Sequence, residues 1–286
     1  MLAFTTREAV LRCGLFNRRR MRDANAEFRA VRTVSLSPFR VESAAITHQG
    51  CVREQNQDSH CDRARDGLWA VADGMGGHEG GEWASARVVE ALERVDLPAG
   101  LAEAGDRVAD AVRVANAAIL AEAERRGRQM GTTMVALLVQ DQRFLVLWVG
   151  DSRAYLLRDG AFTQLSRDHS QVQEMIDRGL MAPNHAIGHP MSHILSRAIG
   201  VREAIEVDRV EGEVRPGDVF LLCSDGLHGY VAQDEIRQRL GRGAPERALD
   251  ELLDLTLAAG APDNVTMIAV WASDPTMLSF TQPGTS

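Results

Sequence analysis

Apolar residues recur in short runs along most of this chain, and residues that favour turns lie between the runs. Runs of this length, rich in β-branched residues, are typical of strands with at least one buried face. They predict strands at residues 41–47, 68–73, 132–139, 144–151, 154–160, 204–210, 218–225 and 264–272. Helical periodicity in the intervening stretches predicts helices at 82–94, 101–126, 171–179 and 245–259.

The order of these elements favours antiparallel sheets. Strands come in neighbouring pairs, such as 132–139 and 144–151, which a short Q-D-Q-R stretch joins as a tight turn. Hairpins of this kind are typical of antiparallel pairing, whereas parallel sheets need a helix between successive strands. The helices also come in pairs. We therefore expect an α+β fold with sheets inside and helices outside.

The two ends of the chain and one internal segment differ from this pattern. Residues 1–40 carry nine Arg against three acidic residues, and we expect them to form a basic, flexible leader, with a membrane-surface or partner-binding helix as the alternative. Residues 273–286 are polar and are expected to fray. Residues 166–200 show little strand signal, and such a long irregular connection is usually functional or mobile. The main domain is expected to cover residues 41–272.

Composition narrows the function classes. The chain has 286 residues, is 45% hydrophobic and has a net charge of −8, so it has material for a sizeable core. No apolar run is long enough to span a bilayer, and the acidic body does not suggest a nucleic-acid partner. All 32 basic residues are Arg, which excludes chemistry that depends on a lysine, such as a P-loop or a Schiff base.

The four cysteines indicate a reducing compartment. No pair has the C-x-x-C spacing of a zinc ribbon or a redox centre, so we expect reduced thiols and a cytoplasmic, monomeric protein. Cys13 and Arg19 satisfy the C-x5-R spacing of thiol phosphatases. Their loop has one glycine and bulky Leu and Phe residues, which makes a poor phosphate cradle.

Acidic residues stand at the ends of several predicted strands. Asp73, Asp151 and Asp225 close apolar runs, and Asp263 precedes one. A single Asp in such a place is an ordinary turn former. Several converging carboxylates, however, would form an all-oxygen site that suits Mg²⁺ or Mn²⁺ better than Zn²⁺.

The segments beside these acids add to the prediction of a phosphate site. Glycines follow Asp73 in the stretch V-A-D-G-M-G-G-H, where they would let the backbone approach a cation and leave room for an anion above it. Arg53 would provide a two-pronged binder for a phosphoryl group. His185, His189 and His193 recur at four-residue spacing, but Gly188 and Pro190 interrupt any helix that would align them, so we interpret them as polar loop residues.

Together these segments resemble the metal-dependent type 2C serine/threonine protein phosphatases, in their bacterial branch. The resemblance covers about residues 41–272 and rests on six motifs in order along the chain. They are R-x-x-N-Q-D at 53–58, V-A-D-G-M-G-G-H at 71–78, G-T-T at 131–133, G-D-S-R-A-Y at 150–155, S-D-G-L at 224–227 and D-N-V-T at 263–266.

The resemblance implies a central β-sandwich of two antiparallel sheets with helices on both outer faces. It also implies two Mn²⁺ or Mg²⁺ ions and, in bacterial members, a third. Asp73 would bridge the two main ions, and the Gly74 carbonyl would bind the second. Asp225 and Asp263 would bind the first, and Asp151 would share the third with Asp225.

The resemblance further implies a reaction in which a metal-activated hydroxide attacks phosphorus without a covalent intermediate. Arg53 would bind phosphate and Asp58 would hold metal-bound water. Where eukaryotic members place a proton-donating His, this chain has Met75, so His78 or a metal-bound water is the candidate donor. Many members also have Glu at the position of Gln57.

The expected partners are phosphorylated Ser/Thr proteins, including a cognate kinase or its substrates. Two alternatives stay open: a pseudo-phosphatase that binds phosphoproteins without hydrolysing them, and a phosphatase of a non-protein phosphoester. The presence of all the matching acids weighs against the first.

Overall fold

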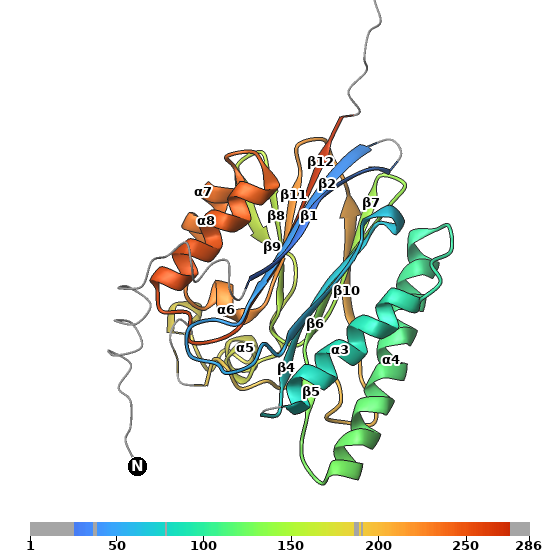
Figure 1. Ribbon diagram of the computed structural model, residues 1–286, viewed down its shortest axis with the longest axis vertical. Coiled ribbons are helices and arrows are strands. Elements are labelled where there is room, and N and C mark those ends of the chain that lie inside the picture. The colour runs from blue at the N-terminus through green and yellow to red at the C-terminus, as the bar shows by residue number, and fades with distance from the viewer. Residues whose placement is uncertain (1–25, 37–38, 78, 186–188, 190, 275–286) are drawn as a thin grey trace, which may run out of the picture.

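Two antiparallel sheets pack face to face in the computed structural model, and helices cover both outer faces (Figure 1). The structure describes residues 26–36, 39–77, 79–185, 189 and 191–274, with side chains from residue 32 onward except that of Asn184. Helices α3 (Glu79–Arg94) and α4 (Leu101–Arg126) cover one sheet, and α7 (Gln233–Leu240) and α8 (Pro245–Ala258) cover the other. The α+β sandwich predicted from the sequence is confirmed.

The first sheet has the strand order β1-β2-β12-β11-β8-β9 within the described part of the chain. Its strands are β1 (Ala26–Leu36), β2 (Phe39–His48), β8 (Arg153–Arg158), β9 (Ala161–Gln164), β11 (Val219–Cys223) and β12 (Val265–Ser273). The second sheet has the order β10-β7-β6-β4-β3, and the short β5 pairs with β4. Its strands are β3 (Asp58–Arg63), β4 (Leu68–Met75), β5 (Gly131–Thr132), β6 (Met134–Gln140), β7 (Arg143–Val149) and β10 (Asp208–Glu213).

Strand β4 shows why its sequence is apolar at nearly every position. Leu68, Ala70 and Ala72 pack into the layer beneath α3 and α4. Trp69 and Val71, which point the opposite way, pack into the layer between the two sheets. Because neighbouring residues of a strand face opposite sides, a strand covered on both faces needs both sets of residues to be apolar. A third apolar layer lies between the first sheet and the helices α6 (Asp225–His228), α7 and α8.

The hairpin predicted from residues 132–151 is present. Strands β6 and β7 pair from Met134↔Val149 to Gln140↔Arg143. Asp141 and Gln142 form the turn with φ values of 47° and 65°, which match the right-handed twist of the strands in a two-residue hairpin.

The structure corrects several expectations. Part of the stretch 1–40 that we expected to be flexible is strand β1, which pairs with β2 on both sides of a register shift between Arg29 and Arg32. Strand β2 itself begins at Phe39 rather than Val41. Strands β3 and β9 and helix α7 were not predicted. Residues 1–25, with Cys13 and Arg19, lie outside the described residues.

Two further observations bear on compartment and membrane. Cys61 and Cys223 are free and buried, whereas Cys51 is disulfide-bonded, so the expectation of reduced thiols fails at that residue. In the part of the chain that the structure describes, every helix is too short or too polar to cross a membrane.

Candidate metal centre and phosphate site

The acidic residues predicted from strand ends meet at one end of the sandwich. Asp58 begins β3 and lies opposite Asp73 of β4 in the strand register. Asp151 follows β7, Asp225 is the first residue of α6 just beyond β11, and Asp263 lies just before β12. An open pocket of about 1080 Å³ collects most of the predicted site residues, namely Arg53, Asp73, Gly74, Asp151, Asp225 and Asp263.

Burial and the mutual repulsion of their charges shift the pKa values of these carboxylates strongly. The pKa of Asp151 is raised to about 8, first by burial and then by the charge of Asp225. The pKa of Asp58 is raised to about 7, again first by burial, although the nearby hydroxyl groups of Thr266 and Ser224 oppose the shift. The pKa of Asp73 is raised well above its usual range by burial and by the neighbouring carboxylates. Positive charge placed among these groups would favour their ionised forms.

Asp58 does not line the pocket, and one of its two carboxylate oxygens has no hydrogen-bond partner in the described part of the chain. Its Oδ2 accepts a 2.8 Å hydrogen bond from Ser224 Oγ. Its Oδ1 is buried and has no hydrogen-bond partner among the described residues. A buried acceptor without a partner is costly, so this oxygen is suited to a water or another donor that enters the site with a ligand.

The donor set fits hard cations that keep much of their water. No three His, Cys, Asp or Glu side chains close around one point in the described structure, so the acids do not form a complete protein cage. Mg²⁺ and similar ions are commonly held by one or two carboxylates, with water completing the shell. The oxygen-only set therefore fits Mn²⁺ or Mg²⁺ rather than a structural zinc.

The G-T-T motif holds Asp73 in place through its main chain. Thr133 N and Thr132 Oγ1 both donate to the Asp73 carbonyl, each at 2.8 Å. Asp73 N donates to Thr133 Oγ1 at 3.1 Å. These bonds fix the end of β4, so the carboxylate reaches the pocket from a rigid support.

Gly74 is required by a close approach of two backbones. A Cβ at this position would lie 2.1 Å from the carbonyl oxygen of Gly81 in α3. Gly74 N donates to Gln57 O at 3.1 Å. The glycine therefore lets α3, β4 and the loop before β3 meet behind the carboxylates.

Arg53 is paired with one of the acids. Its Nη2 lies 2.6 Å from Asp263 Oδ2, and this contact is the main reason why the pKa of Arg53 is raised. Asn264 holds the Arg53 loop in place: its Oδ1 accepts from Gln57 N at 2.8 Å, and its Nδ2 donates to Gln55 O at 2.9 Å. The D-N motif therefore positions both members of the Arg53–Asp263 pair.

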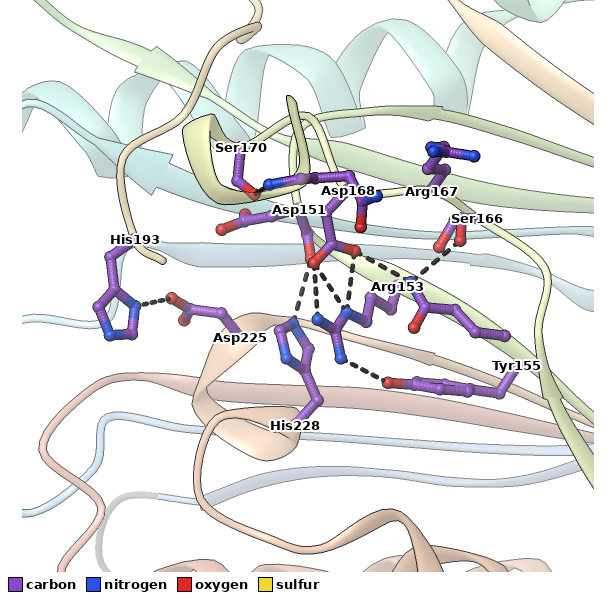
Figure 2. Close-up of polar contacts among 12 residues, drawn as sticks. Asp151, Arg153, Tyr155, Ser166, Arg167, Asp168, Ser170, His193, Asp225 and His228 are labelled. Carbon is purple, nitrogen blue, oxygen red and sulfur yellow. Dashed lines mark hydrogen bonds and ion pairs between the residues drawn. The ribbon is translucent and has the colours of Figure 1, made fainter. Parts of the chain in front are cut away.

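His193 is a site residue that we interpreted as a polar loop residue. Its Nδ1 lies 3.6 Å from Asp225 Oδ2, and its side chain points toward that carboxylate (Figure 2). Burial acts to raise the pKa of Asp225, but the contact with His193 and the nearby His228 lower it overall. His78, the predicted proton donor, lies outside the described residues.

The segment 166–200 is anchored next to Asp151 by a partly buried ion pair. Arg153 Nη2 lies 2.6 Å from Asp168 Oδ2, and Arg153 Nη1 donates to Tyr155 Oη at 3.1 Å (Figure 2). His228 Nε2 lies 3.1 Å from the carbonyl oxygen of Asp151. His169 N also donates to Gly150 O at 2.9 Å, and Gly150 N donates to His169 Nδ1 at 3.0 Å, so the residue next to Asp151 is bonded directly to the segment that carries His193.

The fold and this site define a class of phosphatase-like α-β-β-α proteins with a carboxylate pocket at one end of the sandwich. The protein phosphatase 2C family model matches residues 52–264, and the chain belongs to this family. It is 40% identical over 227 residues to the serine/threonine protein phosphatase PstP of Mycobacterium tuberculosis, covering 79% of this chain and 44% of that one. The chain thus spans less than half the length of that relative.

A shorter relative and a solved structure support the same family assignment. The serine/threonine phosphatase stp of Listeria innocua is 33% identical over 237 residues, covering 78% of this chain and 93% of that one. The crystal structure of the PstP catalytic domain in complex with two manganese ions matches with a TM-score of 0.73 and 38% identity, covering 82% of this chain and 99% of that one. The family resemblance stated from the motifs is confirmed.

Proposed function

We propose that this chain hydrolyses phosphoserine and phosphothreonine on proteins, depends on Mn²⁺ or Mg²⁺, and opposes a bacterial Ser/Thr kinase. The observation that carries the proposal is that Asp73, Asp225 and Asp263 share one pocket with Arg53. Carboxylates that hold cations and a guanidinium that holds a phosphoryl group are the parts that metal-assisted phosphoryl transfer needs. The names of the relatives support the substrate class.

In this proposal the carboxylate and carbonyl oxygens at the strand ends would bind the cations. Asp73 would lie between two ions, with Asp225 and Asp263 on one and the Gly74 carbonyl on the other. Asp151 would hold a third ion together with Asp225. When bound, the ions supply an activated water as the nucleophile and neutralise charge on the phosphoryl group.

The chain's own groups would orient the water and the substrate. Asp58 is held by Ser224 and keeps Oδ1 available, so it would accept a hydrogen bond from water inside the site. Arg53 would leave Asp263 and bind two phosphoryl oxygens through its planar guanidinium. His78, or a water held in the site, would give a proton to the departing serine or threonine oxygen. Because water is the nucleophile, no covalent phosphoenzyme forms.

The test compares three substrates with purified protein in Mn²⁺, Mg²⁺ or EDTA. A phosphothreonine peptide is expected to be hydrolysed faster than the same peptide with phosphotyrosine and faster than glycerol phosphate, and EDTA is expected to abolish all turnover. Faster turnover of glycerol phosphate would assign a non-protein phosphoester instead. Binding of the phosphothreonine peptide without turnover in either metal would indicate a phosphoprotein-binding protein and contradict the proposal.

A further inference from the structure

Exposed apolar side chains gather around the phosphate pocket. Among the described residues, the exposed large hydrophobic side chains are Val52, Val114, Leu180, Ile194, Val201 and Tyr230, and three of these six, Val52, Ile194 and Tyr230, line this one pocket. These three come from separate segments: the loop after β2, the segment before β10 and the turn after α6. Apolar groups that converge from distant parts of a chain on one pocket mark a place that a ligand covers.

Hydrogen bonds anchor the main chain at or next to each of the three residues. Ile194 O accepts from Gln171 N at 2.9 Å, and Tyr230 N donates to Leu227 O at 3.1 Å. Val52 lies between Cys51, whose N donates to Ala261 O at 2.8 Å, and Arg53, whose carbonyl accepts from Gln49 Nε2 at 2.7 Å. Their exposure, 53% for Val52, 43% for Ile194 and 38% for Tyr230, therefore belongs to fixed positions. A surface that is already ordered loses little entropy when a ligand covers it.

The apolar residues lie next to the groups that would bind phosphate. Val52 directly precedes Arg53 in the chain. Tyr230 lines the same pocket as two of the acids, Asp225 and Asp263. Ile194 directly follows His193, which contacts Asp225. A residue next to a bound phosphothreonine, whose Cα lies about 3.8 Å along the chain, would therefore reach this rim.

We propose that Val52, Ile194 and Tyr230 form a specificity subsite that accepts a large apolar side chain adjacent to the phosphorylated residue of a protein substrate. This rests on the proposed phosphatase function and adds to it the sequence context of the substrate. The apolar rim gains by covering such a side chain, whereas a polar neighbour would lose water there without a partner. Glu54 lies on the same pocket and would repel an acidic neighbour.

The test uses two phosphothreonine peptides of equal length that differ only in the residues flanking the phosphothreonine, Leu in one and Ser in the other. The wild-type protein in Mn²⁺ is expected to show a kcat/KM roughly tenfold or more higher for the Leu peptide, carried mainly by KM. In Tyr230→Ser and in Ile194→Ser this ratio is expected to fall toward one. Using a ratio removes any common loss of activity from the comparison.

The matched control is Val114→Ser, because Val114 is 69% exposed on α4 and does not line the pocket. Its ratio is expected to equal that of the wild-type protein. Equal hydrolysis of both peptides by the wild type, or an unchanged ratio in both rim variants, would overturn the subsite while the phosphatase function stands. Hydrolysis of neither peptide would overturn both proposals.

Discussion

Arg53 Nη2 lies 2.6 Å from Asp263 Oδ2, so the predicted phosphate ligand is paired with a predicted metal ligand that lies 210 positions further along the chain. The side chains are 53% and 31% exposed, and ion pairs this exposed contribute little to stability. The pair therefore positions the guanidinium at the carboxylate pocket and adds little to the stability of the fold.

The variant Arg53→Met tests the contribution of this residue to catalysis separately from its contribution to stability. We expect kcat/KM for a phosphothreonine peptide to fall by roughly two orders of magnitude, because the charge that stabilises the phosphoryl oxygens is lost. The free energy of unfolding is expected to change by less than about 1 kcal/mol. Steady-state kinetics and urea denaturation measure both quantities. Arg113→Met, which breaks the exposed Arg113–Asp110 pair on α4, is the control, and an equal loss of activity in the two variants would contradict the assignment.

The carboxylate cluster predicts an unusual pH dependence for protein kept in EDTA. The folded pKa of Asp151 is about 8, against an ordinary value of 3.8, so between these values the folded chain binds more protons than the unfolded chain. The free energy of unfolding therefore falls as pH rises toward 8. Asp151→Asn is expected to flatten this slope in urea denaturation between pH 6.5 and 8.5, and Mn²⁺ to flatten it in the wild type. A slope that Asp151→Asn leaves unchanged would show that burial does not strain this acid.

His228 predicts the opposite slope at lower pH. Burial, followed by the charge of Arg153, lowers its folded pKa from 6.5 to about 4. Between these values unfolding takes up a proton at His228, so the contribution of this group to stability, present above pH 6.5, is lost as pH falls toward 4, by on the order of 3 kcal/mol.

His228→Gln should reduce that acid loss. Since the partner of Nε2 is a carbonyl oxygen, Nε2 carries the proton, and a Gln amide can donate in its place. Urea denaturation between pH 4.5 and 7 measures the effect, with the exposed His185→Gln as control. An identical loss of stability toward low pH in the wild type and in His228→Gln would contradict the burial argument.

Gly74→Ala tests whether backbone packing positions the site. A Cβ there would lie 2.1 Å from Gly81 O, so α3 and β4 must separate, and we expect a loss of about 1–3 kcal/mol in stability together with weaker Mn²⁺ binding. Gly80→Ala is the matched control in α3, because its nearest neighbour is the side chain of Met130 at 3.3 Å. Denaturation and calorimetric Mn²⁺ titration measure the two effects, and similar behaviour of both variants would contradict the packing account.

The sequence was sufficient to predict the elements whose signals are local. The apolar runs that became β4, β6, β7, β11 and β12 are buried on both faces, and short motifs mark the acids beside them. Strand β1 could not be predicted in this way, because its residues are mixed polar and apolar at a sheet edge and its main-chain bonds come from β2.

His193 was missed for a different physical reason. Its position depends on contacts far along the chain, such as the bridge between Ser170 and Leu195 and the bond from Gln171 N to Ile194 O. Spacing among histidines gave no signal for these contacts. The neighbouring stretch H-I-L, with an exposed Ile beside a His, acquires meaning only once the segment is seen beside Asp225.

The most direct test of the central claim is a calorimetric titration of Mn²⁺ into the wild-type protein and into Asp73→Asn, with turnover of a phosphothreonine peptide measured on the same samples. The control is Asp159→Asn, since Asp159 lies in the β8–β9 turn and does not line the pocket. We predict that Asp73→Asn loses both tight Mn²⁺ binding and turnover, while Asp159→Asn keeps both. Wild-type Mn²⁺ affinity and turnover in Asp73→Asn would contradict the claim that the strand-end carboxylates form the metal centre.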